Sequence, residues 1–471
     1  MFPQTTDFRQ FGDPMPFGPW ADADIGQDLS KALTAGVDIN SPGAVAGSGF
    51  PLRPESLDAT LYNLTFRMEH LKLWPQLIKD DVWNTVNEYN VLRQHGSGVE
   101  FFHAEGDLPG EDDSTWQRMY ATIKHMGCTR RYSLVASLVR MAHNNAETHQ
   151  TIGGTMWTLE QLEKALFAGN DSLLGTSIKG YDQQIAHIRD LRGRPLTGDE
   201  VNYGAGLINE APNYGLATDL YMPTGVDTDF VDDVMPNARY NIGQQGWVNG
   251  EAGMQIKVYR TQRGPIALNP DVFLTFGDVP SSVALGNAAK RPGTPTESVA
   301  LAAAGTGSKF EAADAGTYRY KVVAVNRYGK SAPLSLTGTI AVTTGQSVTF
   351  TIADGSPIPE YYEIYRSTKN GAASTCKLMT KLVRDATGLT AVTDANAYLP
   401  GKGRVYLVQQ NREFNLFQRL LRFMKVRLGM IDASFRFMLL LFGELVVHAP
   451  NKALIYINVG RSNRDPHYDV S

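Results

Sequence analysis

The residues of this chain that could bind a metal ion are few and lie apart from one another. His125 and Cys128 stand three positions apart, which is a plausible spacing for two zinc ligands. A structural zinc site takes four ligands, and no second pair of cysteines or histidines completes this one. We therefore interpret His125 and Cys128 as structural residues at the base of a β-hairpin.

A run of aspartates is the next candidate for cation binding. A calcium-binding loop also has a central glycine and a terminal glutamate, and this run lacks both. Acidic side chains in the first turn of a helix interact favourably with the helix dipole, which explains the run without a metal. The residues are Asp227, Asp229, Asp232 and Asp233.

Motifs of nucleotide-binding and hydrolytic enzymes are missing from the sequence. It has no G-x-x-x-x-G-K-[ST], G-x-S-x-G or H-E-x-x-H pattern, and "GAGLINE" at 204–210 lacks the third glycine of a dinucleotide-binding loop. A glycan hydrolase needs two carboxyl groups that face one another across a cleft, whereas the best acidic cluster, "GEDD" at 110–113, lies in a loop. We predict no catalytic, cofactor-binding or metal-binding residue and no enzyme activity.

The composition is that of an ordinary globular protein. The chain has 471 residues, enough for about three domains, and is 42% hydrophobic and 20% charged. Its net charge of −4 gives no electrostatic footprint for nucleic acid. Two cysteines, Cys128 and Cys376, cannot form a disulfide framework and suit a reducing cytoplasm. The first residues lack the basic and apolar regions of a signal peptide.

Residues 1–55 are rich in glycine, proline and aspartate and show little periodicity. We expect an extended arm that becomes ordered by lying on another surface, and simple disorder is the alternative. A helical pattern begins near Leu57, because Leu57, Leu61 and Leu64 are three or four residues apart.

Two segments with β-forming residues, 82–96 and 116–127, flank a strongly acidic loop. We predict a long hairpin at about 84–127 with an acidic tip and a basic base. An isolated hairpin is marginal in water, so this one is expected to lie on another surface. Tip and base could pair between neighbouring copies, although charge alone favours a solvated loop. The candidate contact residues are Glu105, Asp107, Glu111, Asp112, Asp113, Arg93 (next to Leu92), Arg118, Lys124, Arg130 and Arg131.

Helix patterns follow the hairpin. Thr158 and Gln161 have capping-box spacing, and the leucine stripe after them predicts a helix at about 155–169 with Gly169 as its C-cap. The same spacing in Thr197 and Glu200 predicts a second helix that continues to residue 212.

The next segment alternates strand and helix. "LATDLYMPTGV" at 216–226 predicts a strand, and the following short helix is expected to be capped by Asp227 or Thr228 and to end at Pro236. This alternation predicts an α/β or α+β region.

The composition changes again near residue 285. "GNAAKRPGTPTES" is typical of a linker, and short alternating strands separated by turns follow it, which indicates a β-sandwich of about a hundred residues. After about Gly403 the mixed character returns, so the sandwich is predicted to be an insertion within the main fold.

The most apolar stretch, "FRFMLLLFGELVVHAPNKALIYINVG", covers residues 435–460. A membrane-spanning helix needs about 20 consecutive apolar residues, but Arg436 and Glu444 bracket only seven uncharged ones. Alternation places four apolar side chains on one face of a strand, namely Phe435, Phe437, Leu439 and Leu441. We predict two buried strands joined by a turn at "APNK".

The order of these parts resembles the major capsid proteins of tailed bacteriophages, which have the Hong Kong-type capsid fold, and among them those of large contractile-tailed phages. The resemblance covers about residues 55–285 and 403–460. It is carried by "LTFRMEHLKLWPQLIKDDVWNTVNEYNVLRQHG", "GLATDLYMPTGVDTDFVDDVM" and "IDASFRFMLLLFGELVVHAPNKALIYINVG". In the last stretch His448 stands where the family has a basic residue.

The insertion looks like an immunoglobulin-like or fibronectin type III-like module, with a Y-x-Y-x-V-x-A-x-N-x-x-G run at 318–329. The resemblance implies an α+β fold in these parts: an N-terminal arm at 1–55, a first core part at 56–285, the inserted all-β sandwich at 286–402, and a second core part at 403–471 with the C-terminal strands. Within the first core part it implies the extended hairpin at about 84–127, a spine helix at about 155–169 and an axial domain at about 185–285. The last strands are expected in a peripheral domain.

The resemblance implies a structural protein of the virion that assembles in the host cytoplasm. It would form the hexamers and pentamers of an icosahedral head that encloses double-stranded DNA without sequence-specific binding. Its expected partners are further copies of itself and the portal, scaffold and decoration proteins, with no membrane. The alternatives are a phage tail or surface protein that binds carbohydrate through the sandwich, and a glycan hydrolase with a sandwich accessory.

Overall fold

The computed structural model describes residues 65–96, 98, 101–108, 110–139, 145–238, 256–275, 277–284, 288–305, 307–430 and 432–461. The predicted arm at 1–55 and the leucine pattern at 57–64 lie outside the described residues. Helices and strands are mixed along the rest of the chain, which confirms the predicted α+β class. Short helical turns are α2 (Leu73–Gln76), α3 (Leu134–Leu138), α5 (Tyr181–Gln184), η3 (Met68–His70), η5 (Ala288–Lys290), η6 (Ala312–Asp314), η7 (Ala373–Thr375) and η8 (Pro450–Lys452).

A four-stranded sheet contains the longest strands of the molecule. Its order is β1 (Lys79–Asp81), β21 (Asn415–Arg427), β22 (Ser434–Val447) and β4 (Lys124–Ser133). β22 is antiparallel to both long neighbours. Successive side chains of a strand point to opposite faces, and Phe437, Leu439 and Leu441 are buried on one face, while Phe435 is half-buried. The predicted alternation is therefore confirmed for the three residues from Phe437 to Leu441.

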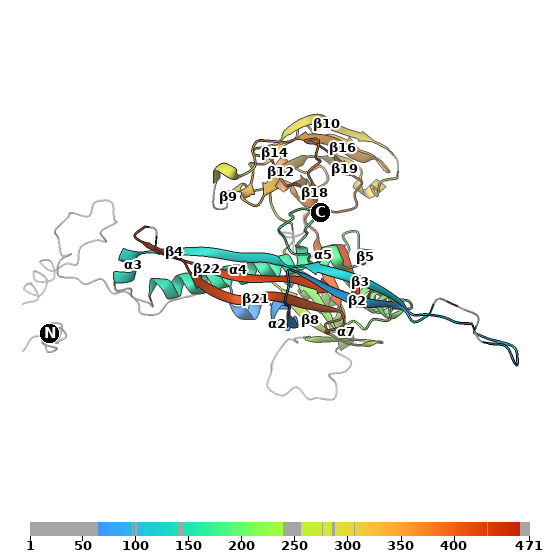
Figure 1. Cartoon of the computed structure of the whole chain (residues 1–471). Coiled ribbons are helices and arrows are strands. Elements are labelled where there is room, and N and C mark those ends of the chain that lie inside the picture. Colours follow the sequence, from blue (N-terminus) through green and yellow to red (C-terminus); the bar gives the residue numbers. More distant parts are fainter. Residues whose placement is uncertain are drawn as a thin grey trace, which may run out of the picture. The chain divides into compact units, whose positions relative to one another are not determined.

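The helix α4 (Ala146–Ala168) packs on this sheet and runs alongside β4 and β22 (Figure 1). The predicted helix is confirmed, but its predicted start is wrong. Thr158 lies in the helix interior, where its hydroxyl donates to the Gly154 carbonyl over 2.8 Å. The first turns of α4 were not predicted, because glycine disfavours helices and two glycines stand at 153–154. A Cβ at Gly154 would lie 2.7 Å from Leu439 Cδ1, so the glycine allows close packing.

A six-stranded mixed sheet forms the second half of the core. Its order is β5 (His187–Asp190), β23 (Leu454–Val459), β20 (Gly403–Val408), β6 (Asp219–Pro223), β8 (Gly264–Asp271) and β7 (Val258–Thr261). Along β20, Val405 and Leu407 join one hydrophobic cluster, whereas Tyr406 and Val408 join the other. Burial on both faces explains why β23 reads as a continuous apolar run.

The helices α6 (Gly198–Asn209) and α7 (Thr224–Ala238) belong to the cluster on one face of this sheet. The Thr197 hydroxyl accepts the Glu200 N–H over 3.4 Å, which confirms the predicted N-cap. The boundaries predicted for α7 are wrong. It begins at Thr224, before the predicted caps, and Pro236 falls inside its last turn instead of ending it. The β6 strand ends directly at α7 and leaves no room for a separate cap.

The two apolar strands near the C-terminus are buried, as predicted, and η8 joins them. They do not pair with one another, because β22 lies in the four-stranded sheet and β23 in the six-stranded sheet. Among the described residues, no helix has the length and apolar character needed to cross a membrane.

The predicted hairpin is confirmed as a two-stranded ribbon of β2 (Val86–Gln94) and β3 (Thr115–Thr122) (Figure 1). It is shorter than the sequence suggested. The chain leaves the ribbon at the buried Ile123 and continues as β4 in the four-stranded sheet. The segment at 116–127 is thus shared between two sheets.

Residues 283–394 form a separate set of strands. One sheet holds β10 (Thr296–Ala304), β16 (Ser347–Ala353) and β19 (Leu389–Asp394). The other holds β18 (Lys377–Val383), β17 (Tyr361–Arg366), β12 (Tyr320–Asn326), β13 (Gly329–Lys330) and β9 (Val283–Ala284), with β14 (Leu334–Ser335) beside β12. A further pair is β11 (Gly316–Tyr318) and β15 (Ile340–Val342). The sheets enclose their own hydrophobic cluster, which includes Tyr320, Val322 and Phe350.

Candidate interaction surfaces

The two faces of the β2–β3 hairpin differ in burial. On the inner face, Tyr89 packs edge-on against the His448 ring at 4.7 Å between centroids, and Ala121 is buried. On the outer face, Trp116 and Tyr120 are 66% and 68% exposed. Large exposed aromatic side chains on a polar ribbon are typical of a surface that contacts another protein. We call this outer face, with Val86, Trp116 and Tyr120, the hairpin face.

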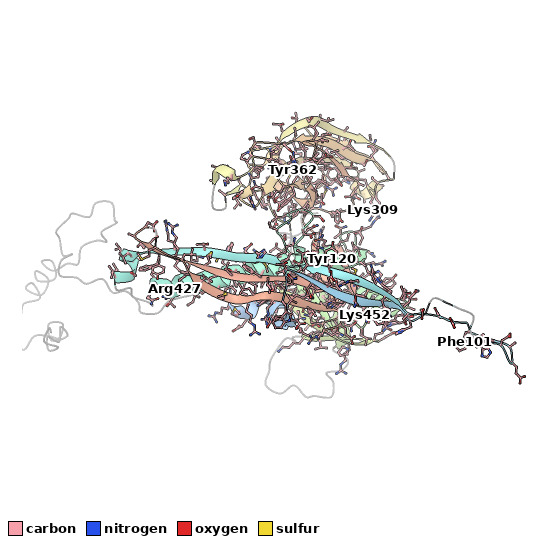
Figure 2. All side chains as sticks on the ribbon, in the orientation of Figure 1. Phe101, Tyr120, Lys309, Tyr362, Arg427 and Lys452 are labelled. Atoms are coloured by element: carbon pink, nitrogen blue, oxygen red, sulfur yellow. The ribbon has the colours of Figure 1, made fainter. Side chains whose placement is uncertain are left out.

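The tip of the hairpin is also apolar. Phe101 and Phe102 stack edge-on at 5.1 Å between centroids and are 84% and 83% exposed, and Leu108 is exposed too. Figure 2 shows Phe101 at the far end of the ribbon and Tyr120 nearer its base. Only the charged residues of this loop were predicted as contacts, although "FF" in an acidic loop is a visible signal for these apolar side chains.

The acidic residues at the tip point to solvent. All five predicted carboxylates are exposed. Among the described residues, the structure records no ion pair for four of them, namely Glu105, Asp107, Glu111 and Asp113. The tip therefore presents negative charge around an apolar pair of rings.

The basic residues on the hairpin itself bind within the chain. Arg118 forms an exposed ion pair with Glu88 across the two strands. Arg93 Nε donates to Gln117 Oε1 over 2.7 Å. Both contacts are exposed, and exposed pairs contribute little to stability. Arg93 and Arg118 can therefore exchange these contacts for contacts with another chain at little cost in free energy.

The basic residues on β4 face different surroundings. Lys124 Nζ donates to the Gly175 carbonyl over 2.7 Å. Arg130 lies over the Trp157 ring of α4, 5.9 Å from its centroid. These two residues fix β4 to its own core, and the sequence did not indicate this.

The far end of β4 combines positive charge with exposed apolar side chains. Arg131 is well exposed and lies 3.9 Å from Asp432, which also pairs with Arg436. In the adjoining α3, Val135 and Leu138 are 66% and 77% exposed. This end of the sheet is a second candidate for protein contact.

Glu147, in the first turn of α4, was not singled out from the sequence. Its carboxylate accepts hydrogen bonds from Lys425 Nζ over 2.6 Å and from Arg427 over 2.8 Å, while the Tyr132 hydroxyl donates to it over 3.1 Å. The hydrogen bond from Lys425, followed by that from Arg427, lowers the pKa of Glu147 to about 2. Partners 278 and 280 residues away give no local signal in the sequence.

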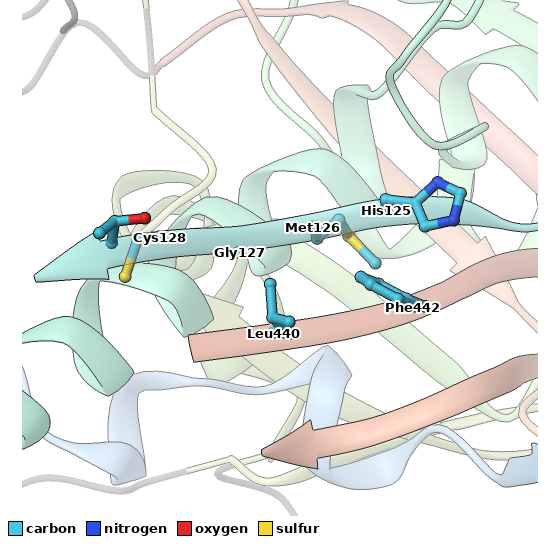
Figure 3. A pocket seen from close by; sticks show the side chains of 7 residues that line it. His125, Met126, Gly127, Cys128, Leu440 and Phe442 are labelled. Carbon is cyan, nitrogen blue, oxygen red and sulfur yellow. The ribbon is translucent and has the colours of Figure 1, made fainter. Parts of the chain in front are cut away.

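His125 and Cys128 line a shallow hollow of about 220 Å³ beside β4 and β22, together with Leu440 and Phe442 (Figure 3). The His125 ring lies edge-on to Phe442 at 4.5 Å. Cys128 Sγ lies 3.4 Å from the Thr158 hydroxyl of α4, and its thiol is free. Both residues thus pack against their own core. Within the described part of the chain, no three histidine, cysteine, aspartate or glutamate side chains gather as metal ligands would.

The aspartates of α7 serve the fold in part. Asp233 Oδ2 accepts the Gly198 N–H at the start of α6 over 2.9 Å, and Asp229 lies 3.5 Å from Arg461. Burial raises the pKa of Asp227. These contacts connect α7 to its neighbours.

These surfaces combine exposed apolar side chains with charged ones, as sites of protein contact do. No protein-family model matches the chain. It is 25% identical over 448 residues to a putative major capsid protein of Enterococcus phage phiEF24C, covering 91% of this chain and 94% of that protein. It is 26% identical over 443 residues to the major capsid protein of Staphylococcus phage K, covering 90% and 93%.

Chains of solved capsids align more loosely. The capsid of myovirus phage XM1 gives a TM-score of 0.45 at 8% identity, covering 88% of this chain and 99% of that chain. The capsid of a native GTA particle gives 0.46 at 8% identity, covering 89% and 99%. The sequence relatives confirm the predicted resemblance to phage major capsid proteins.

Proposed function

We propose that this chain is the major capsid protein of a tailed phage, a structural component of the virion. The main support for this proposal is the similarity of the chain to named major capsid proteins over nine-tenths of both chains. Because the alignment extends through the core as well as the sandwich, it favours this function over a carbohydrate-binding tail or surface protein. In this proposal the chain forms the hexamers and pentamers of an icosahedral head and has no enzyme activity.

The hairpin face supports assembly. A two-stranded ribbon has little core of its own, and the outward side chains of Trp116 and Tyr120 leave a large apolar area in water. A second copy that covers this face would bury that area. The same contact repeated between copies is heterologous, and such contacts close into rings. Rings of five or six copies are the capsomers of the proposed head.

The charged residues support a polar contact between copies. The exposed carboxylates of the tip, including Glu105 and Asp107, would face basic side chains such as Arg118 and Arg131 of a neighbour. These ion pairs are solvent-exposed, so their contribution is small and salt weakens it. In the proposal they set the register of the contact, and the aromatic residues supply most of its free energy.

The remaining partners follow from the head itself. We propose portal, scaffold and decoration proteins as partners, and double-stranded DNA as an enclosed cargo that is not recognised by sequence. The net charge of −4 fits a shell without tight phosphate contacts.

We also propose that the chain has three parts. They are an arm at 1–55, a core at 56–285 and 403–471, and an immunoglobulin-like or fibronectin type III-like module at 286–402. The module is joined to the core by a few polar contacts. Lys309 Nζ donates to Asp190 over 3.0 Å, and Asn458 Nδ2 donates to the Ala397 carbonyl over 2.9 Å.

The test is electron microscopy and size-exclusion chromatography of the full chain. The proposal predicts closed shells, rings or tubes of the expressed protein. Replacing Trp116→Ser together with Tyr120→Ser should leave a folded chain that stays small. The matched control replaces Ile358→Ser and Val383→Ser, which are similarly exposed on the sandwich, and should assemble normally. A wild-type chain that remains monomeric at high concentration, even with scaffold protein added, would contradict the proposed function.

A further inference from the structure

A buried carboxylate of α4 holds the segment at 71–77, which we call the N-terminal connector. Glu163 is fully buried and contributes no exposed surface. Its Oε1 accepts the N–H groups of Lys72 over 2.9 Å and Leu73 over 2.6 Å, and its Oε2 accepts the Trp74 N–H over 2.9 Å. Three backbone donors thus converge on one carboxyl group and tie the start of α2 to the C-terminal part of α4.

A second buried carboxyl group contacts the first. Asp271, at the end of β8, is fully buried and lies within hydrogen-bonding reach of Glu163. Its Oδ1 accepts the Phe273 N–H over 2.7 Å, whereas its Oδ2 has no donor among the described residues. Two carboxylates in contact repel one another, and a proton between them removes the repulsion and supplies the missing donor. A proton held by Glu163 can be donated to Asp271 Oδ2, which is the oxygen that lacks a donor among the described residues.

The surrounding groups do not neutralise a second negative charge. Lys72 lies near Asp271 and Lys79 lies near Glu163, and both are only half-buried. The buried hydroxyls of Tyr181 and Tyr221 have raised pKa values, mainly because of burial, and remain neutral. The nearby carboxylate of Asp219 adds negative charge.

The connector is joined to the six-stranded sheet by the same polar cluster. Gln76 Nε2 donates to Asn269 Oδ1 over 3.1 Å, and Asn269 Nδ2 donates to Asp219 Oδ1 over 2.9 Å. The cluster therefore connects the connector, α4 and the adjacent inner strands β6 and β8 of the sheet. Burial, with the charge of Asp271, raises the pKa of Glu163 to about 7.

We propose that Glu163 and Asp271 share one proton, and that this proton closes the joint between the N-terminal connector and α4. The joint is tightest in mild acid and loosens as the pH approaches 7, because both carboxyl groups then carry charge in a buried site. The carboxyl groups of an opened joint are in water and lose the proton near pH 4.5. Between that pH and about 7, only the closed joint keeps it. Above about 7 the joint stays in its weaker form.

The test is amide hydrogen exchange of residues 72–74 in the full-length protein between pH 5 and pH 8, corrected for intrinsic exchange. The expected result is a loss of protection of up to roughly tenfold per pH unit between pH 5 and 7, and a plateau above that. Protection that is constant over this range would overturn the proposal. The measurement reports on a local joint in any assembly state, so its outcome is distinguishable from failure of the capsid function.

The decisive variant is Asp271→Asn. An asparagine amide can donate to Glu163 permanently and can still accept the Phe273 N–H, so the loss of protection between pH 5 and 7 should disappear. The matched control is Glu444→Gln, a buried carboxyl group that accepts the Lys179 N–H and does not touch the connector. It should leave the profile of residues 72–74 unchanged. A wild-type profile in Asp271→Asn would overturn the shared proton.

A second measurement identifies the protonated group directly. Infrared difference spectra of the Glu444→Gln control, with carbon-13 in the glutamate carboxyl groups, should show a protonated glutamic acid at pH 6 that is lost by pH 8. If every glutamate of this variant is ionised at pH 6, Glu163 does not hold the proton and the proposal fails.

Discussion

The strands at 296–394 and the hairpin at 86–122 show two ways of using short β-strands. The sandwich buries tyrosine, valine and phenylalanine side chains between its sheets. It also buries Arg366, which donates to Asp394 over 2.6 Å and lies over the Phe310 and Tyr318 rings. The hairpin exposes the aromatic side chains of its outer face, with Trp116 66% and Tyr120 68% accessible. The strands of the sandwich bury their apolar side chains within the chain, whereas the hairpin leaves those of one face exposed to solvent.

The difference shows where each region obtains its stability. The sandwich has a hydrophobic cluster and a paired buried charge, so its contacts are complete within one chain. The hairpin has one face on its own core and one face without a partner in the described chain, so the free energy of covering that face is available only to assembly. Substitutions in the sandwich should change the free energy of unfolding, whereas those on the hairpin should change association.

The largest effect on unfolding is expected for Arg366→Ala. It leaves the carboxylate of Asp394 buried without its cation, which costs about 3–5 kcal/mol. Chemical denaturation followed by tyrosine fluorescence measures this loss. The control is Arg327→Ala, an exposed residue of the same module, which should change the free energy of unfolding by less than about 0.5 kcal/mol. Equal effects of the two substitutions would show that the buried ion pair does not contribute to the stability of the sandwich.

A smaller, pH-dependent effect is expected for Glu444→Gln at the root of the hairpin. Burial raises the pKa of Glu444 to about 8, and its Oε2 and the Oε1 of the opposite Gln418 are buried without donors among the described residues. The folded protein therefore keeps a proton that the unfolded chain loses near pH 4.5. Its contribution to stability is fully present below that pH and is lost as the pH rises to about 8.

The glutamine variant should lack this loss, because its amide can donate to Gln418 at any pH. It should therefore be more stable than the wild type by about 2–4 kcal/mol at pH 9, with a smaller advantage at pH 5. Denaturation midpoints at both pH values provide the measurement. A constant difference between wild type and variant would show that Glu444 is ionised throughout.

Removal of the aromatic tip should hardly change unfolding. Phe101→Ala with Phe102→Ala removes two exposed rings, so the free energy of unfolding should change by less than about 0.5 kcal/mol. Shell formation, measured by light scattering, should require a higher protein concentration. Unchanged assembly would limit the contact to the hairpin face and exclude the tip.

The smallest effect is expected for Arg118→Ala. The exposed pair with Glu88 contributes about 0.2–1 kcal/mol at most. If Arg118 also faces an acidic tip of a neighbour, the variant should lose part of the salt dependence of assembly while its unfolding curve is nearly unchanged. A wild-type salt dependence would exclude Arg118 from the contact.

Much of the fold could be predicted from local patterns. Alternation identified the hairpin and the strand with Phe437, Leu439 and Leu441, and the spacing of Thr197 and Glu200 identified the start of α6. Local patterns failed where a neighbour decides the structure. The start of α4 was missed because its glycines disfavour helices, and Gly154 is there to admit Leu439 of the sheet.

The candidate surfaces were predicted only in part. The acidic tip was visible in the sequence, and its carboxylates are exposed, but its role as a contact between copies stays a prediction. The uses of Lys124, Arg130 and Glu147 were not visible, because their partners are distant in sequence or belong to the backbone.

The sequence alone determined the α+β class, the strand and helix periodicities, the low charge and the family resemblance, because composition and local spacing carry these directly. Only the tertiary structure decided that the last two apolar strands enter different sheets, that Trp116 faces outward, and that Glu163 meets Asp271. The physical reason is that burial and carboxyl–carboxyl contact depend on residues more than a hundred positions apart, which no local pattern records.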